Sequence, residues 1–222
     1  MNRTLVRTSA LAAAGAQVAL AVYIARFGPT SPIPMHFDLA GQVDRWGTRS
    51  ETAFVIGLMA GLSAVAALGL DQLTLGRRVP PASPRVMMLT TIVIVAVASA
   101  VSVLMAAVAF GLTPVGAALF GHLTISFALT GIGAYLGKVG PNPLIGVRTP
   151  WTFASRLAWD KSNRLMGRLF FWGGLSGIVA APFAPQPAGL SLLAAVLLAS
   201  AALAAFESWR VWRTDPDRAT WS

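Results

Sequence analysis

Six long apolar segments occupy most of the sequence and restrict what it can fold into. They cover residues 8–24, 52–70, 86–112, 115–136, 169–184 and 188–206. Most approach or exceed the roughly 20 residues that a helix needs to cross the hydrocarbon core of a bilayer. Only 11% of the residues are charged, compared with about 25% in a soluble domain. The sequence therefore predicts an all-α integral membrane protein, a bundle of six transmembrane helices plus a cytoplasmic interfacial helix.

The distribution of the basic residues predicts the orientation of these helices. Six spans place both termini on the same side of the membrane. If that side is the cytoplasm, all of the 17 lysine and arginine residues except Arg26, Arg45 and Arg49 lie in cytoplasmic segments, in agreement with the positive-inside rule. The net charge of +9 is then spread over four separate segments, so we predict no direct binding of nucleic acid. The chain has no cysteine, which excludes a disulfide framework and a cysteine nucleophile.

One polar segment, residues 138–168, interrupts the apolar pattern between the fourth and fifth spans. Its Gly140-Pro-Asn-Pro143 run cannot continue a helix, whereas Thr149 and Pro150 are a typical N-cap and first helical residue. We expect one helix to follow. The residues on its apolar stripe are Trp151, Ala154, Ala158 and Leu165, with Trp159 and Met166 beside them. Its basic residues are Arg156, Lys161, Arg164 and Arg168.

Three interpretations of the polar segment remain open. A helix with tryptophan on one side and basic residues elsewhere suits the headgroup layer of a membrane. The same surface could dock a cytoplasmic partner. A catalytic site is the weakest of the three, because Ser155, Asp160 and Ser162 have no neighbouring histidine or second carboxylate to form an acid–base or nucleophilic set. We therefore predict no catalytic residues and no cofactor.

The outer loop, about residues 27–51, contains a second group of polar and aromatic residues. His36, Asp38 and Asp44 could in principle ligate a metal. However, metal sites usually have three or four good ligands, and the chain has only one other histidine, so we predict no metal. Trp46 suits a membrane interface. The loop is either a structured lid with internal hydrogen bonds or a contact for an external peptide or lipid headgroup.

Two features inside the spans also have competing interpretations. His122 is the one clearly ionisable residue at membrane depth, where such residues often serve ion or proton transfer. Because no carboxylate lies at comparable depth, the alternative is a neutral histidine hydrogen-bonded between helices. Glycine pairs four residues apart favour close helix packing, either within the chain or in a dimer. These pairs are Gly57/Gly61, Gly133/Gly137 and Gly173/Gly177.

Two motifs carry a family resemblance. Pro34-Met-His-Phe-Asp38, followed by Gly41, Asp44, Trp46 and Gly47, resembles the conserved module of unknown function that often precedes an SdpI domain. Asn142-Pro-Leu-Ile-Gly-Val-Arg148-Thr-Pro-Trp151, followed by Trp159 and Asn163-Arg-Leu-Met-Gly167, resembles the SdpI signature itself. We therefore divide the chain into a first transmembrane hairpin with its outer loop, residues 1–70, and an SdpI-like domain with four transmembrane helices, residues 71–222.

The resemblance implies a bacterial plasma-membrane immunity protein with cytoplasmic termini. In the family's namesake system, the immunity protein resists a secreted sporulation-delaying peptide toxin and holds a transcriptional repressor at the membrane. The implied cytoplasmic determinant contains Asn142, Arg148, Thr149, Pro150, Trp151, Trp159, Asn163, Arg164 and Gly167. The implied outer determinant contains His36, Asp38, Asp44 and Trp46.

We therefore expect a non-enzymatic membrane immunity and signalling protein. Its expected partners are the lipid bilayer, a peptide toxin outside and a transcriptional repressor inside. The alternatives are a small transporter or ion-leak regulator that uses His122 and, less favoured, a membrane enzyme.

Overall fold

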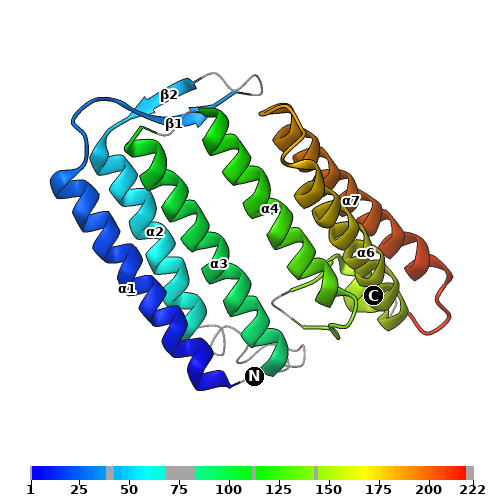
Figure 1. Ribbon diagram of the computed structural model, residues 1–222. Coiled ribbons are helices and arrows are strands. Elements are labelled where there is room, and N and C mark those ends of the chain that lie inside the picture. Colours follow the sequence, from blue (N-terminus) through cyan, green and yellow to red (C-terminus); the bar gives the residue numbers. More distant parts are fainter. Residues whose placement is uncertain (1, 39–42, 69–83, 112–113, 143–144, 219–222) are drawn as a thin grey trace.

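The protein is a bundle of long helices with a small β-hairpin at one end (Figure 1). The computed structural model describes residues 2–38, 43–68, 84–111, 114–142 and 145–218. The helices are α1 (Arg3–Phe27), α2 (Arg49–Leu68), α3 (Pro84–Ala109), α4 (Pro114–Leu136), α5 (Pro150–Ala154), α6 (Arg156–Ala180) and α7 (Ala188–Thr214). The strands are β1 (Ile33–Phe37) and β2 (Val43–Gly47). The start of α1 and the end of α7 lie at the end of the bundle opposite the hairpin. We call this end of the bundle the terminal end, and the opposite end, where β1 and β2 lie, the hairpin end.

The all-α membrane fold predicted from the sequence is confirmed. Among the described residues, five helices are long and apolar enough to cross a membrane: α1, α2, α3, α4 from Ala118, and α7. The count of six spans and the cytoplasmic position of the termini stay predictions. The predicted domain boundary between residues 70 and 71 lies outside the described residues.

The course of the chain from residue 150 to residue 184 differs from the prediction. We expected one interfacial helix from Pro150 and a separate span from Leu169. Instead, the helical break falls at Ser155, and α6 runs without interruption from Arg156 to Ala180. The side-chain hydroxyl of Ser155 accepts the backbone N–H of Ala158 at 2.9 Å and so caps α6. The predicted apolar stripe is therefore divided, because Trp151 and Ala154 belong to α5.

The outer loop folds as an antiparallel pair of strands, β1 and β2, which the sequence analysis did not predict. The register shifts twice along this pair. Ile33 of β1 is buried against Val108 and Ala109 at the end of α3. On the side of α2, the Thr52 hydroxyl lies 3.5 Å from the Met35 sulfur. The hairpin is thus packed against the ends of α2 and α3.

The helices pack in two groups that meet between α3 and α4. In the first group, α1, α2 and α3 contact one another. Polar side chains link them: Gln17 of α1 donates to Ser99 of α3 at 3.1 Å, and Thr91 of α3 donates to the Ala66 carbonyl of α2 at 3.0 Å. In the second group, α6 lies between α4 and α7 and contacts both, and its Phe170 packs with Leu129 and Leu193 in an apolar core.

Glycines allow α4 and α6 to cross at close range. A Cβ atom added to Gly133 of α4 would lie 2.3 Å from the backbone nitrogen of Phe171 and 2.7 Å from the carbonyl oxygen of Gly167. The pair Gly133/Gly137 therefore serves packing within this chain. By contrast, a Cβ added to Gly57 or Gly61 would meet nothing within 4 Å.

Candidate functional site

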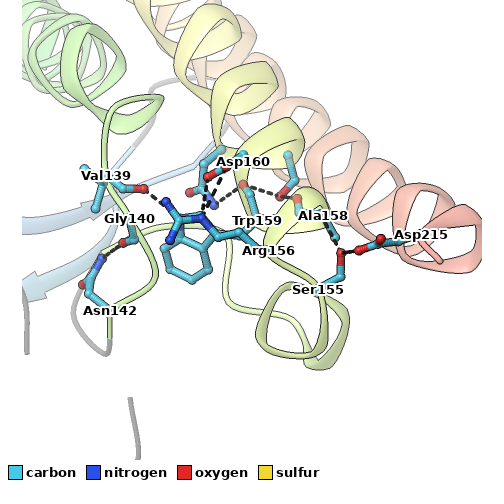
Figure 2. Close-up of polar contacts among 11 residues, drawn as sticks. Val139, Gly140, Asn142, Ser155, Arg156, Ala158, Trp159, Asp160 and Asp215 are labelled. Atoms are coloured by element: carbon cyan, nitrogen blue, oxygen red, sulfur yellow. Dashed lines mark hydrogen bonds and ion pairs between the residues drawn. The ribbon is translucent and has the colours of Figure 1, made fainter. Parts of the chain in front are cut away.

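The polar segment 138–168 is held by buried hydrogen bonds around Trp159 (Figure 2). The Trp159 side chain has 0% exposure, and its indole N–H donates to the Val139 carbonyl at 2.7 Å. One turn later, the Asn163 amide donates to the Trp159 carbonyl at 2.9 Å and accepts the Val147 N–H at 2.8 Å. Trp159 is thus an interior residue of the protein. These bonds fasten the chain after α4 onto α6.

Asn142 and Gly146 shape the turn between α4 and α5. The buried Asn142 amide donates to the carbonyls of Gly140 and Ile145, and its oxygen accepts the Ile145 N–H. Gly146 has a φ of 131°, which favours glycine. A Cβ at Gly146 would also lie 2.7 Å from the Asn163 side-chain oxygen. The side chains of Asn142 and Asn163 therefore hold the backbone at Ile145 and Val147 in place.

The short helix α5 is tied to α7 at both of its ends. Thr149 caps α5 in a reciprocal capping box with Thr152, and Pro150 occupies the first helical position, as predicted from the sequence. The Thr149 hydroxyl also lies 2.9 Å from the Ser208 hydroxyl of α7. At the other end, the Ser155 hydroxyl donates to the buried carboxylate of Asp215, which directly follows α7 (Figure 2). The segment is therefore fixed against both α6 and α7.

The predicted cytoplasmic determinant does not form one surface. Its members Asn142, Trp159, Asn163 and Gly167 are buried, whereas Arg148, Pro150 and Arg164 are exposed and Trp151 is half-buried. Arg148 and Trp151 lie at the start of α5. Arg164 lies on the exposed face of α6, away from that start. The buried members support the fold of the segment, and only the exposed ones are placed to meet another molecule.

A basic cavity of about 730 Å³ opens beside the motif. It lies between α4, α6 and the terminal end of α7. The basic residues in its wall are Lys138, Lys161, Arg164 and Arg168. Its acidic lining residue, Glu207, is bound by Arg210, whose guanidinium nitrogens lie 2.8 and 2.9 Å from the two carboxylate oxygens.

All four residues of the predicted outer determinant, His36, Asp38, Asp44 and Trp46, are exposed. His36 and Asp44 form a pair across the strands, with 2.6 Å between Nδ1 and Oδ1. Trp46 is 57% exposed. Within the part of the chain that the structure describes, no three histidine or acidic residues come together as metal ligands. Asp38 lies just beyond β1 and is exposed. The hairpin therefore offers an exposed indole beside a hydrogen-bonded polar pair.

His122 is buried between helices and has a partner on each ring nitrogen. Its Nε2 lies 3.0 Å from the Gly177 carbonyl of α6, and its Nδ1 lies 3.1 Å from the amide nitrogen of Gln186. A carbonyl only accepts and an amide nitrogen only donates. One neutral tautomer, with the proton on Nε2, therefore satisfies both contacts.

Comparison with known protein families gives two matches. Residues 138–206 match the SdpI/YfhL protein family, and residues 16–61 match a domain of unknown function, DUF1648. These two matches are consistent with an SdpI-type protein with a preceding DUF1648 module. Comparisons with curated proteins and with solved structures gave no match. Both matches fall on the motifs from which the sequence analysis inferred the resemblance.

The SdpI match begins at Lys138 and covers the polar segment, α6 and most of α7. It therefore includes the buried hydrogen bonds around Trp159 and all four basic residues of the cavity wall, Lys138, Lys161, Arg164 and Arg168. From the sequence we counted Lys138 only as an orientation signal, and we named Lys161 and Arg168 only as basic residues of the predicted interfacial helix. Their positions could have predicted a shared face, because residues 161, 164 and 168 are spaced by three and four along α6. The Ser155–Asp215 contact had no such signal, since 60 residues separate its partners.

Proposed function

We propose that this SdpI-type protein is a non-enzymatic membrane immunity protein that protects its cell from a secreted peptide toxin and docks a cytoplasmic regulator. Membership of the SdpI family suggests a membrane immunity-type protein, and the family is not a known enzyme family. The observation that carries the proposal is that the motif contains one set of buried residues and another set of exposed residues. Its buried residues hold the polar segment rigidly, while Arg148 and Trp151 are presented at the start of α5.

The outer hairpin supports the toxin half of the proposal. An exposed tryptophan beside polar groups suits binding to a peptide at a membrane surface, because tryptophan is enriched among the residues that dominate interface energies. In this proposal, the hairpin binds the toxin at the hairpin end, and the exposed face at the start of α5 binds the regulator at the terminal end.

Production of the protein in a toxin-sensitive bacterium should raise survival after challenge with a sporulation-delaying peptide. The Trp46→Ala variant should weaken toxin binding by about thirtyfold, the effect of a tryptophan that dominates an interface. Phe183→Ala is a matched control, since Phe183 is an aromatic residue 85% exposed near the hairpin end. The proposal would be contradicted if the wild-type protein gave no protection. It would also be contradicted if the two variants, at equal levels in the membrane, lost toxin binding equally.

The regulator half is tested separately at Arg148. We expect Arg148→Ala to release a repressor, followed by a fused fluorescent protein, from the membrane into the cytoplasm. The reason is that arginine contributes strongly to binding energy in the desolvated centre of an interface. Toxin survival should remain unchanged. Arg156→Ala is the control in the same segment, since Arg156 is exposed and forms an ion pair with Asp160 of its own helix at 3.3 Å. Retention of the repressor by Arg148→Ala would argue against this docking surface.

A further inference from the structure

The wall of the basic cavity has an excess of positive charge, with four basic residues and one acidic residue, Glu207. Lys138, Lys161, Arg164 and Arg168 line its wall. Within the described residues, none of these four side chains forms an ion pair within 4 Å. Glu207 attracts Lys161 but is already bound by Arg210 through both carboxylate oxygens. The cavity is therefore complementary to an anion.

The chemistry of the four cations favours a phosphate. Arginine presents a planar fork of N–H donors that matches the oxygens of a phosphate, and lysine adds a compact charge. Arg164 and Arg168 lie one turn apart on the same face of α6. The cavity volume of about 730 Å³ lies within the range of about 300–1,000 Å³ typical of small-molecule sites.

The cavity changes from basic to apolar along α6. Its wall continues from Lys161 and Arg164 to Phe171 and Trp172, and ten residues of helix separate Lys161 from Phe171, a distance of about 15 Å. Trp172 is 62% exposed. An amphipathic occupant would place its phosphate at the terminal end and its apolar part toward the middle of the bundle. A soluble phosphate would use only the basic half.

A second, apolar groove continues from the first. Arg168 and Trp172 belong to the walls of both cavities. The groove has a volume of about 460 Å³ and runs between α6 and α7, past Gly173 and Gly177 to Ala180. From Arg168 to Ala180 the helix rises about 18 Å, comparable with half of the roughly 30 Å hydrocarbon core. Small side chains on α6 thus leave room for one acyl chain within one leaflet.

We propose that the basic cavity and the adjoining α6–α7 groove form a binding site for an anionic phospholipid. Lys138, Lys161, Arg164 and Arg168 bind its phosphate, and the groove accommodates an acyl chain. Basic pockets between transmembrane helices are known to select anionic lipid headgroups. The site is separate from Arg148 and from the outer hairpin, so the inference does not depend on a toxin or a regulator.

Native mass spectrometry of the full chain tests the proposal. The protein is purified in detergent containing equal amounts of phosphatidylglycerol and phosphatidylcholine, and the bound lipids are compared. We expect wild type to prefer phosphatidylglycerol. At about 1 kcal/mol for each basic residue, Arg164→Gln or Arg168→Gln should each lower that preference about fivefold, and the double variant should lower it about thirtyfold.

Matched variants separate the cavity from general charge. Arg213→Gln/Arg218→Gln removes the same charge from residues outside both cavity walls near the terminal end and should keep the preference. The double variant Arg164→Lys/Arg168→Lys keeps the charge and should keep most of the preference for phosphatidylglycerol. If the double glutamine variant does not fold, the two single variants decide the result.

Three outcomes would overturn the proposal. The first is equal binding of the two lipids by the wild-type protein. The second is an unchanged preference in the Arg164 and Arg168 variants, which would place the lipid elsewhere. The third is displacement of phosphatidylglycerol by glycerol 3-phosphate at equal concentration, which would show a site for a soluble phosphate. Failure of the toxin assay would leave this result unchanged, because phosphatidylglycerol alone is the probe.

Discussion

Replacement of Trp159 by alanine is expected to lower the free energy of unfolding by about 3–5 kcal/mol, the usual cost of deleting a buried tryptophan. The side chain has 0% exposure and contacts the Phe153 ring, with 6.0 Å between centroids. Its loss also leaves the buried Val139 carbonyl without the indole donor, which carries its own desolvation cost. An unfolding titration of the purified protein in mixed micelles measures the change.

Two further variants separate the contributions of Trp159. Trp159→Phe keeps most of the apolar volume but removes the N–H donor, so we expect a smaller loss of about 1–3 kcal/mol. Trp172→Ala removes the same side chain from a site that is 62% exposed and should change the unfolding free energy much less. If Trp159→Ala and Trp172→Ala lower the free energy of unfolding equally, then Trp159 does not hold the polar segment to α6. The interpretation of the motif would then be wrong.

The apolar segments predicted the long helices because membrane helices must bury nearly every side chain in hydrocarbon or in one another. The start of α5 at Thr149 and Pro150 could also be predicted, because an N-cap threonine and a proline at the first helical position act on neighbouring residues alone. The break at Ser155 was missed, although the Ser155 hydroxyl is a local N-cap that accepts the Ala158 N–H. The same hydroxyl also donates to the carboxylate of Asp215, a partner that only the folded chain brings beside α5.

The hairpin and the buried residues of the motif also could not be predicted from local sequence patterns. The strands β1 and β2 are short and their register shifts twice, so no regular alternation marks them in the sequence. Asn142 and Asn163 are polar and were predicted as binding residues. In the structure their amides bond to backbone groups that the turns leave unpaired, and a sequence does not reveal which amide finds such a partner.

Substitution of Gly133 by alanine is the second change with a large expected effect. The added Cβ would lie 2.3 Å from the backbone nitrogen of Phe171 and 2.7 Å from the carbonyl oxygen of Gly167. Because both obstacles are backbone atoms, no side chain can rotate away, and α4 and α6 must move apart. We expect a loss of about 3 kcal/mol in the free energy of unfolding, at the upper end of the usual range for overpacking.

Gly131→Ala provides a matched control on the same helix, because a Cβ at Gly131 would meet nothing within 4 Å. Alanine is favoured over glycine inside a helix by up to about 1 kcal/mol, so this variant should be as stable as wild type or slightly more stable. Gly133 and Gly167 also line the basic cavity. Separation of α4 and α6 should therefore weaken phosphatidylglycerol retention in Gly133→Ala but not in Gly131→Ala. Equal stability of the two variants would mean that α4 and α6 do not cross at Gly133, and the cavity beside them would then have a different shape.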